Sequence, residues 1–157
     1  MNELVQTKII NILKAKKWTI ACAESCTGGL LIAHLIDVPG ASEVINESYV
    51  TYSIDAKSRL LGVDTALVEE YGVASTEVSL AMAKGLFGKC GANVCIATTG
   101  EAGSSLTNKA QTFCYYTIII NDEYYSFITE SVATRNEARA AFCEEIYRQL
   151  LELLKAK

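Results

Sequence analysis

The sequence predicts an α/β fold, in which helices cover both faces of a mixed β-sheet to form a three-layer α/β/α domain. Short apolar runs typical of buried strands alternate with helical stretches through much of the chain, which predicts parallel β-α units. Nearer the C-terminus, two β-rich runs flank Asn121-Asp122, which indicates an antiparallel hairpin. The length of 157 residues predicts a single domain over 1–157 with a sizeable core.

Five stretches have the composition of strands. Residues 19–24 are small and apolar, as a buried strand should be, and residues 47–53 are rich in β-branched and aromatic side chains. An apolar run at 92–98 predicts a third strand. Residues 112–120 and 123–132 form the two arms of the expected hairpin.

Helical periodicity accounts for most of the remaining chain. Ser75, which follows Gly72 and precedes Val78, has the pattern of a capped helix start, and Pro39-Gly40 marks a turn. Residues 99–109 are expected to form a loop. The expected helices cover residues 2–16, 27–37, 55–61, 64–71, 75–89 and 134–155.

Composition limits the partners of this domain. Half of the residues are hydrophobic and 20% are charged, which is typical of a soluble globular protein. The net charge of −4 and the absence of a dense Lys/Arg run argue against a nucleic acid or an anionic membrane as partner. No segment is long and apolar enough to span a bilayer, and the amphipathic N-terminus does not resemble a signal peptide. We therefore expect a cytoplasmic protein.

The six cysteines are expected to be reduced thiols, because the chain is large enough to fold without disulfides and has no export signal. No C-x-x-C pair occurs, and the nearest spacing, Cys22 to Cys26, crosses a strand-to-helix turn. That pattern favours buried thiols over a zinc site. We therefore expect no zinc site at these cysteines.

Ser25 stands between the strand at 19–24 and the following helix, which is a suitable place for a nucleophile. Backbone N–H groups at a helix start lack internal partners, so an oxyanion or phosphate could be held there. The alternative is that Ser25 or Thr27 simply caps the helix.

The base for Ser25 must be a residue other than histidine. The one histidine, His34, follows on the same expected helix, roughly 13 Å from Ser25 at ~1.5 Å rise per residue. A Ser-His-Asp triad within one chain is therefore excluded, which leaves a Lys, Tyr or carboxylate as base. Tyr52 and Lys57 lie at the end of a strand and in the next helix, where both could reach one strand-end crevice. Alternatively, Lys57 is a solvated surface amine.

A second motif, Thr98-Thr99-Gly100-Glu101-Ala102-Gly103, again places hydroxyls and glycines after an apolar strand. It could bind a ligand or form a flexible polar turn.

These motifs resemble, in order and spacing, those of the CinA C-terminal domain family, which includes the nicotinamide-nucleotide amidohydrolases, or PncC enzymes. The resemblance extends from about residue 4 to 155. The matching segments are Ala23-Glu24-Ser25-Cys26-Thr27-Gly28-Gly29, Pro39-Gly40-Ala41-Ser42, Val50-Thr51-Tyr52-Ser53 with Ala56-Lys57, Leu61-Gly62-Val63, Tyr71-Gly72-Val73-Ala74-Ser75, Met82-Ala83 and Thr99-Gly100-Glu101-Ala102-Gly103.

The resemblance implies a Ser/Lys amidohydrolase that converts nicotinamide mononucleotide to nicotinate mononucleotide and ammonia without metal or cofactor, as a homo-oligomer. Ser25 would be the nucleophile, Lys57 the general base and Tyr52 an assisting hydroxyl. Arg135 or Arg139 would bind the substrate phosphate through its fork of donors. The other expected substrate-binding residues are Glu24, Cys26, Thr27, Gly28, Thr99 and Gly100.

The chain departs from the family pattern near the expected substrate pocket. Glu101 stands where the family has Ile, and residues 104–111 replace a Gly-rich ligand loop. Ile54 and Thr134 replace a common Asn and an Asp. Side chains such as Leu106, Asn108 and Gln111 are expected to alter the pocket. An alternative function is therefore a non-catalytic domain that binds a nucleotide or a protein.

Overall fold

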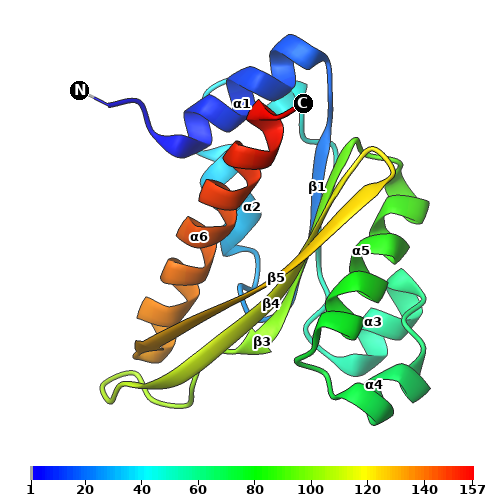
Figure 1. Ribbon diagram of the computed structural model, residues 1–157, viewed down its shortest axis with the longest axis vertical. Helices are drawn as coiled ribbons and strands as arrows, with labels where there is room; N and C mark the ends of the chain where they lie inside the picture. Colours follow the sequence, from blue (N-terminus) through cyan, green and yellow to red (C-terminus); the bar gives the residue numbers. More distant parts are fainter. Residues whose placement is uncertain (1) are drawn as a thin grey trace.

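A computed structural model describes residues 2–157 as a five-stranded sheet with helices on both faces (Figure 1). The strands are β1 (Ile20–Glu24), β2 (Tyr49–Val50), β3 (Val94–Glu101), β4 (Ala110–Ile120) and β5 (Glu123–Ala133). The helices are α1 (Val5–Lys16), α2 (Leu30–Ile36), the short 3₁₀ helix η1 (Ala41–Glu43), α3 (Ile54–Leu61), α4 (Thr65–Tyr71), α5 (Thr76–Cys90) and α6 (Arg135–Lys155).

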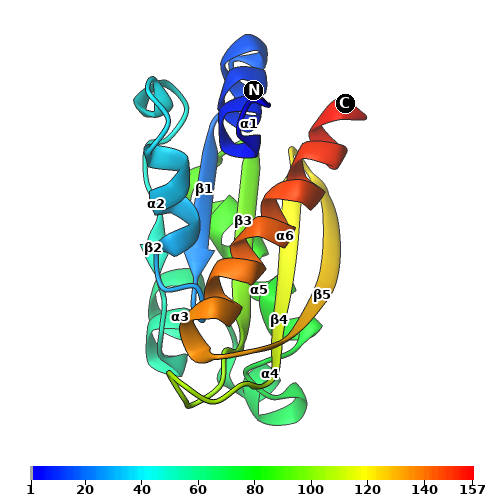
Figure 2. The ribbon, with the colours of Figure 1, turned by 90° about the vertical axis from the view of Figure 1, so that its left-hand side faces the viewer.

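The sheet is mixed, with the strand order β2-β1-β3-β4-β5. β1 pairs in parallel with both β2 and β3, whereas β3, β4 and β5 are antiparallel neighbours. Helices α1, α2 and α6 cover one face, and α3, α4 and α5 lie on the other (Figures 1 and 2). The predicted three-layer α/β/α architecture with a mixed sheet is thus confirmed.

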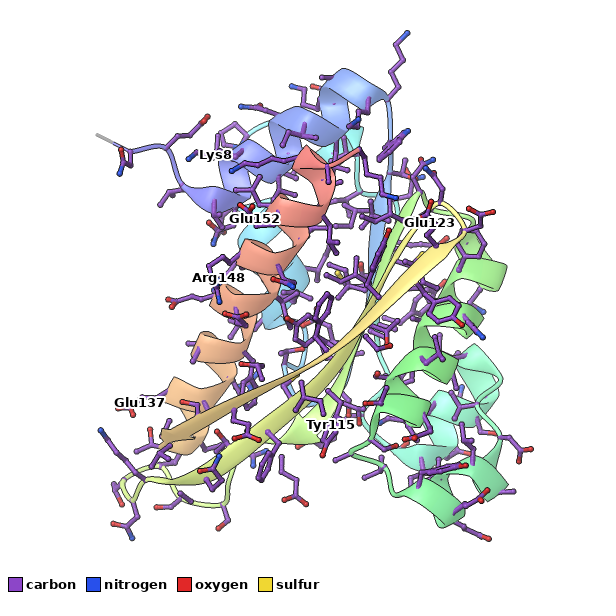
Figure 3. All side chains as sticks on the ribbon, viewed as in Figure 1. Lys8, Tyr115, Glu123, Glu137, Arg148 and Glu152 are labelled. Atoms are coloured by element: carbon purple, nitrogen blue, oxygen red, sulfur yellow. The ribbon has the colours of Figure 1, made fainter. Side chains whose placement is uncertain are left out.

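Two hydrophobic clusters hold the layers together, because successive strand residues point to opposite faces. In β1, Ile20 and Cys22 pack in the cluster beneath α1, α2 and α6, whereas Ala21 and Ala23 pack in the cluster beneath α3 and α5. Side chains fill the space on both sides of the sheet (Figure 3). β1 therefore ends between two packed layers, and Ser25 is the first residue after it.

The expected elements are present, but several boundaries differ. Helix α2 begins at Leu30 rather than residue 27, because Gly28 and Gly29 adopt φ values of 59° and 95° that make a turn before it. Only Tyr49–Val50 of the expected strand 47–53 pairs, and the Ser53 hydroxyl instead accepts from the N–H of Ala56 to cap α3. β3 continues to Glu101, so part of the expected loop 99–109 is strand.

The hairpin turn lies at Asn121-Asp122 as predicted, with Asn121 in the left-handed region at φ 58°. Within residues 2–157, no helix combines the length and apolar character needed to cross a membrane.

Candidate active site

Ser25 and Lys57 meet at the carboxyl end of β1. Lys57 Nζ donates a hydrogen bond of 2.9 Å to Ser25 Oγ. Ser25 follows directly after β1, and Lys57 lies in the first turn of α3, where the Ser53 cap fixes the start of the helix. The structure therefore brings together the two residues that the sequence analysis assigned as nucleophile and base.

Lys57 is fully buried, so the alternative of a solvated surface amine is wrong. Its Nζ also donates to the carbonyl oxygen of Thr51 at 2.7 Å. Burial lowers the pKa of Lys57 because the ammonium loses hydration, and the charge on the nearby Cys26 sulfur opposes this in part. A desolvated amine in contact with a hydroxyl has the properties of a general base.

The backbone of Ser25 is fixed by the neighbouring strand β3. Its N–H donates to Thr98, at 3.1 Å to the carbonyl oxygen and 3.2 Å to Oγ1. The Thr98 hydroxyl also bonds to that of Thr27 at 2.8 Å. Thr27 is thereby completely buried and lies outside the cavity, which corrects its assignment as a substrate-binding residue.

Glu24 is also a structural residue rather than a substrate-binding one. Its buried carboxylate accepts from the N–H groups of Leu31 at 2.8 Å and Ile32 at 3.1 Å. These are the orphan donors of the first turn of α2, and the negative charge suits this end of the helix. Glu24 therefore accepts the backbone N–H groups at the start of α2 that the sequence analysis had considered for an anion. The alternative that the Ser25 or Thr27 side chain caps this helix is not observed.

Arg139 holds the turn that follows Ser25. Its Nε donates to the carbonyl oxygen of Cys26 at 3.0 Å and its Nη2 to that of Thr27 at 2.9 Å. A Cβ at Gly28 would lie 3.0 Å from Nη2, and the φ of 59° already disfavours a side chain. Gly28 and Arg139 thus shape the turn, and neither lines the cavity.

Beside this dyad is a cavity of about 490 Å³, a volume in the range of small-molecule sites. Ser25 opens into it, whereas Lys57 lies behind the serine and does not line it. The lining residues are Ser25, Cys26, Tyr52, Val73, Thr99, Gly100, Glu101, Ala102, Gly103, Ser104 and Arg135. Of the substrate-binding residues expected from sequence, Cys26, Thr99, Gly100 and Arg135 line this cavity.

Arg135 supplies the positive charge in the cavity lining. Its Nη1 donates to the carbonyl oxygen of Gly103 at 2.6 Å, and its Nη2 donates to the Tyr52 hydroxyl at 3.0 Å. Thr134 and Glu137 form a capping box that fixes the start of α6, where Figure 3 labels Glu137. Between the two arginines considered for phosphate, only Arg135 faces the cavity. Tyr52 also lies at the rim, bonded to Arg135 rather than to Ser25.

Thr99 and Gly100 line the cavity but also have structural roles. The Thr99 hydroxyl donates to the carbonyl oxygen of Val73 at 2.7 Å. A Cβ at Gly100 would lie 2.1 Å from the carbonyl oxygen of Phe113 in β4, so strand pairing there requires glycine.

The segment 104–111 forms less of the cavity than expected. Ser105 Oγ accepts from the N–H groups of Thr107 and Asn108, and the Ser105 carbonyl accepts from Arg135 N–H. This turn directs the following residues outward, so that Leu106 is 68% exposed. Ser104 is the member of the segment that lines the cavity, and the expectation for Leu106, Asn108 and Gln111 is corrected.

His34 lies half-buried on α2, and its ring centroid is 6.4 Å from that of Tyr147. All six cysteines are free thiols. Within residues 2–157, no cluster of three or more His, Cys, Asp or Glu side chains has a metal-binding arrangement.

Sequence reasoning missed the roles of Thr98 and Thr51, which fix Ser25 and Lys57. It also assigned no site role to Val73, which lies in the cavity wall. Thr98 begins a motif that the sequence analysis identified, so its strand-end position was a usable signal. Val73 belongs to a segment that matches the family, but an apolar side chain carries no chemical signal of a site.

Known proteins share both sequence and fold with this chain. The CinA-like protein of Petrotoga mobilis is 31% identical over 155 residues, which are 98% of this chain and 38% of that protein. The CinA-like protein of Chlorobaculum tepidum is 50% identical over 95 residues, which are 60% of this chain and 22% of that protein. Much of each relative therefore has no counterpart in this chain.

Two solved structures illustrate the shared fold. The competence/damage inducible protein of Agrobacterium tumefaciens has a TM-score of 0.82 and 29% identity, with 95% of this chain and 93% of that one covered. A CinA superfamily protein of Klebsiella pneumoniae has a TM-score of 0.89, with 98% and 97% covered, and at 22% identity supports the fold alone. The family model for the CinA C-terminal domain matches residues 2–155. The chain therefore belongs to the CinA C-terminal domain family.

Proposed function

We propose that this domain is an amidohydrolase that converts nicotinamide mononucleotide and water to nicotinate mononucleotide and ammonia through Ser25 and Lys57. The main support is the 2.9 Å contact between Lys57 Nζ and Ser25 Oγ at the wall of a ligand-sized cavity. The burial of Lys57 supports the same role, since a lowered pKa makes a neutral amine available as a base.

In the proposed reaction, neutral Lys57 takes the proton of Ser25 as Oγ attacks the amide carbonyl carbon. The amide C–N bond then breaks, and the Lys57 ammonium returns the proton to the departing nitrogen, which leaves as ammonia. Water, deprotonated by Lys57, attacks the resulting ester. Its collapse gives the carboxylic acid and restores the Ser25 hydroxyl.

Substrate orientation is assigned to Arg135 and Tyr52, which also line the cavity. The guanidinium of Arg135 is positioned to bind the phosphate, because a planar fork of donors matches phosphate oxygens. Tyr52 accepts a hydrogen bond from Arg135, which supports a role for Tyr52 in orienting that guanidinium rather than in proton transfer.

Ammonia release from nicotinamide mononucleotide by the purified protein tests this function. Activity is expected in the unmodified chain and its loss in Ser25→Ala. Lys8→Ala, an exposed change on α1, serves as the control. If the unmodified protein binds the nucleotide but releases no ammonia, the proposal is wrong and the non-catalytic candidate described next is favoured.

The second candidate is a non-catalytic domain that binds a nucleotide or a protein. The observation that favours the protein-binding form of this candidate is Glu101, an acidic residue in the lining of the cavity that would accept a phosphate. Like charges in a confined site repel each other, so Glu101 weakens the case for a phosphorylated substrate. Binding measurements combined with the ammonia assay distinguish the two candidates.

A further inference from the structure

Cys26 and Cys114 form a close thiol pair beneath the cavity. Their sulfur atoms are 3.7 Å apart, although the residues are 88 positions apart in sequence. Cys26 lies in the turn after Ser25, and Cys114 lies within β4. A disulfide needs a sulfur separation of about 2.05 Å, so the two atoms must approach by roughly 1.7 Å. One partner lies in a turn rather than in a strand, which makes that movement feasible.

The two thiols differ in their access to a reagent. Cys26 is 8% exposed and lines the cavity, whereas Cys114 is completely buried. A small oxidant entering the cavity therefore reaches Cys26 first. Cys114 then lies directly behind it, in the position of a resolving thiol.

The surroundings of Cys26 also favour its reactive form. The hydrogen bond between the two sulfur atoms lowers the pKa of Cys26. Burial opposes this shift, and the Thr98 hydroxyl and the backbone N–H groups of Cys26 and Thr27 lower the pKa further. For Cys22 and Cys143 burial is the largest cause, and it raises both pKa values, that of Cys143 to about 12. Of these three cysteines, Cys26 therefore forms the reactive thiolate most readily.

We propose that Cys26 and Cys114 are a peroxide-sensitive dithiol, in which Cys26 is oxidised first and Cys114 closes the disulfide. The Cys26 thiolate attacks one oxygen of a hydroperoxide, the O–O bond breaks, and the protonated second oxygen leaves as water or an alcohol. Cys26 is then a sulfenic acid. The Cys114 sulfur attacks the Cys26 sulfur, a disulfide forms, and the hydroxyl leaves as water. Two thiols are oxidised while one peroxide is reduced.

Disulfide formation also affects Ser25. The turn is tied by Arg139 to the carbonyls of Cys26 and Thr27, so a shift of Cys26 strains those bonds and moves its neighbour Ser25. The contact of Ser25 with Lys57 is then disturbed. This consequence for turnover rests on the proposed amidohydrolase function, whereas the thiol chemistry does not.

The test is thiol counting by alkylation and mass spectrometry of the whole protein after treatment with hydrogen peroxide. The oxidised protein should lose two alkylatable thiols, regain them with dithiothreitol, and give a peptide that links Cys26 to Cys114. Cys114→Ser should instead stop at the Cys26 sulfenic acid, which dimedone traps. Cys95→Ser is the matched control, because it removes a buried thiol outside the cavity and should leave the linked peptide unchanged.

Two results would overturn the dithiol proposal. One is that Cys26 stays unmodified at peroxide concentrations that oxidise other cysteines. The other is that Cys114→Ser still loses two thiols to a disulfide. If the linked peptide forms in a protein without ammonia-releasing activity, the dithiol stands and the proposed function fails. If the protein is active, oxidation should lower kcat at least fivefold and reduction should restore it.

Discussion

Lys57 Nζ lies 2.9 Å from Ser25 Oγ and 2.7 Å from the Thr51 carbonyl oxygen, so the amine has a fixed position against the serine hydroxyl. Removing either member of the pair should abolish most turnover. We expect Ser25→Ala and Lys57→Met each to lower kcat by ~100-fold or more, because an unassisted serine hydroxyl is a poor nucleophile. Initial rates of ammonia release measure this effect.

The double variant provides the sharper measurement of this pair. Residues that act as one unit lose activity non-additively, so the double variant should be hardly slower than either single one. Near-normal kcat in Lys57→Met, with circular dichroism confirming its fold, would contradict the assignment of Lys57 as base.

The pH dependence of kcat/KM should report the Lys57 amine. Burial lowers its pKa, and the reaction requires the neutral form. kcat/KM should therefore rise with pH through a pKa below the usual ~10.4 of lysine. Steady-state kinetics at a series of pH values measure this rise in kcat/KM. A profile independent of pH from the acid side up to ~10 would contradict this prediction.

The same shift predicts how stability changes with pH. The pKa of Lys57 is ~10.4 in the unfolded chain and lower in the folded chain, because burial disfavours the ammonium. Between these two values the unfolded state binds more protons, so the free energy of unfolding should rise with pH. Urea unfolding at several pH values measures the slope. Lys57→Met should show a smaller slope across that window.

The two arginines of the first turns of α6 should respond differently to substitution. Arg135→Ala should raise KM about tenfold or more because it removes the cavity guanidinium, and Arg135→Lys should also impair binding because the paired donors are lost. Arg139→Ala should mainly lower kcat and thermal stability, since Arg139 holds the carbonyls of the Ser25 turn. Equal KM effects from both would show that the phosphate is bound elsewhere.

Glu24 should contribute to stability through its two hydrogen bonds to α2. Glu24→Gln keeps the shape but turns an amide NH₂ toward a backbone donor, so it should lower the free energy of unfolding by about 1–3 kcal/mol. Urea unfolding provides the measurement. Glu69→Gln, an exposed change on α4, is the control and should change stability little. An unchanged midpoint for Glu24→Gln would contradict the capping role.

The predicted and observed sites agree where residue type alone determined the chemistry. A serine after a buried strand and a lysine one turn into the next helix could be identified as a pair, because strand ends converge in α/β sheets. Glu24 could not be separated from the ligand-binding residues of its motif. Its carboxylate reaches α2 only because two left-handed glycines delay the helix start to Leu30.

The arginines show a second limit of sequence reasoning. Arg135 and Arg139 are four residues apart and lie on the same side of one helix, so their spacing does not distinguish them. The difference comes from packing, which places the Ser25 turn against Arg139 and the Gly103 carbonyl against Arg135. Such contacts between distant segments are not encoded in local pattern.

Glu101, rather than the outward-facing part of the 104–111 segment, should determine how well the cavity accepts a phosphorylated substrate. Glu101 is part of the cavity lining, whereas Leu106 is not and is 68% exposed. Removing the negative charge in Glu101→Gln should lower KM for nicotinamide mononucleotide by about fivefold, which corresponds to roughly 1 kcal/mol of repulsion. Glu101→Ile should have a similar effect.

Parallel kinetics with nicotinamide riboside, which lacks the phosphate, separate charge repulsion from a change in cavity shape. If charge repulsion is the cause, KM should fall for the nucleotide and not for the riboside. Leu106→Gly combined with Asn108→Gly should leave kcat/KM within about twofold for both substrates. If instead that pair of glycines raised kcat/KM for the nucleotide and Glu101→Gln did not, specificity would reside in the segment after Ser105.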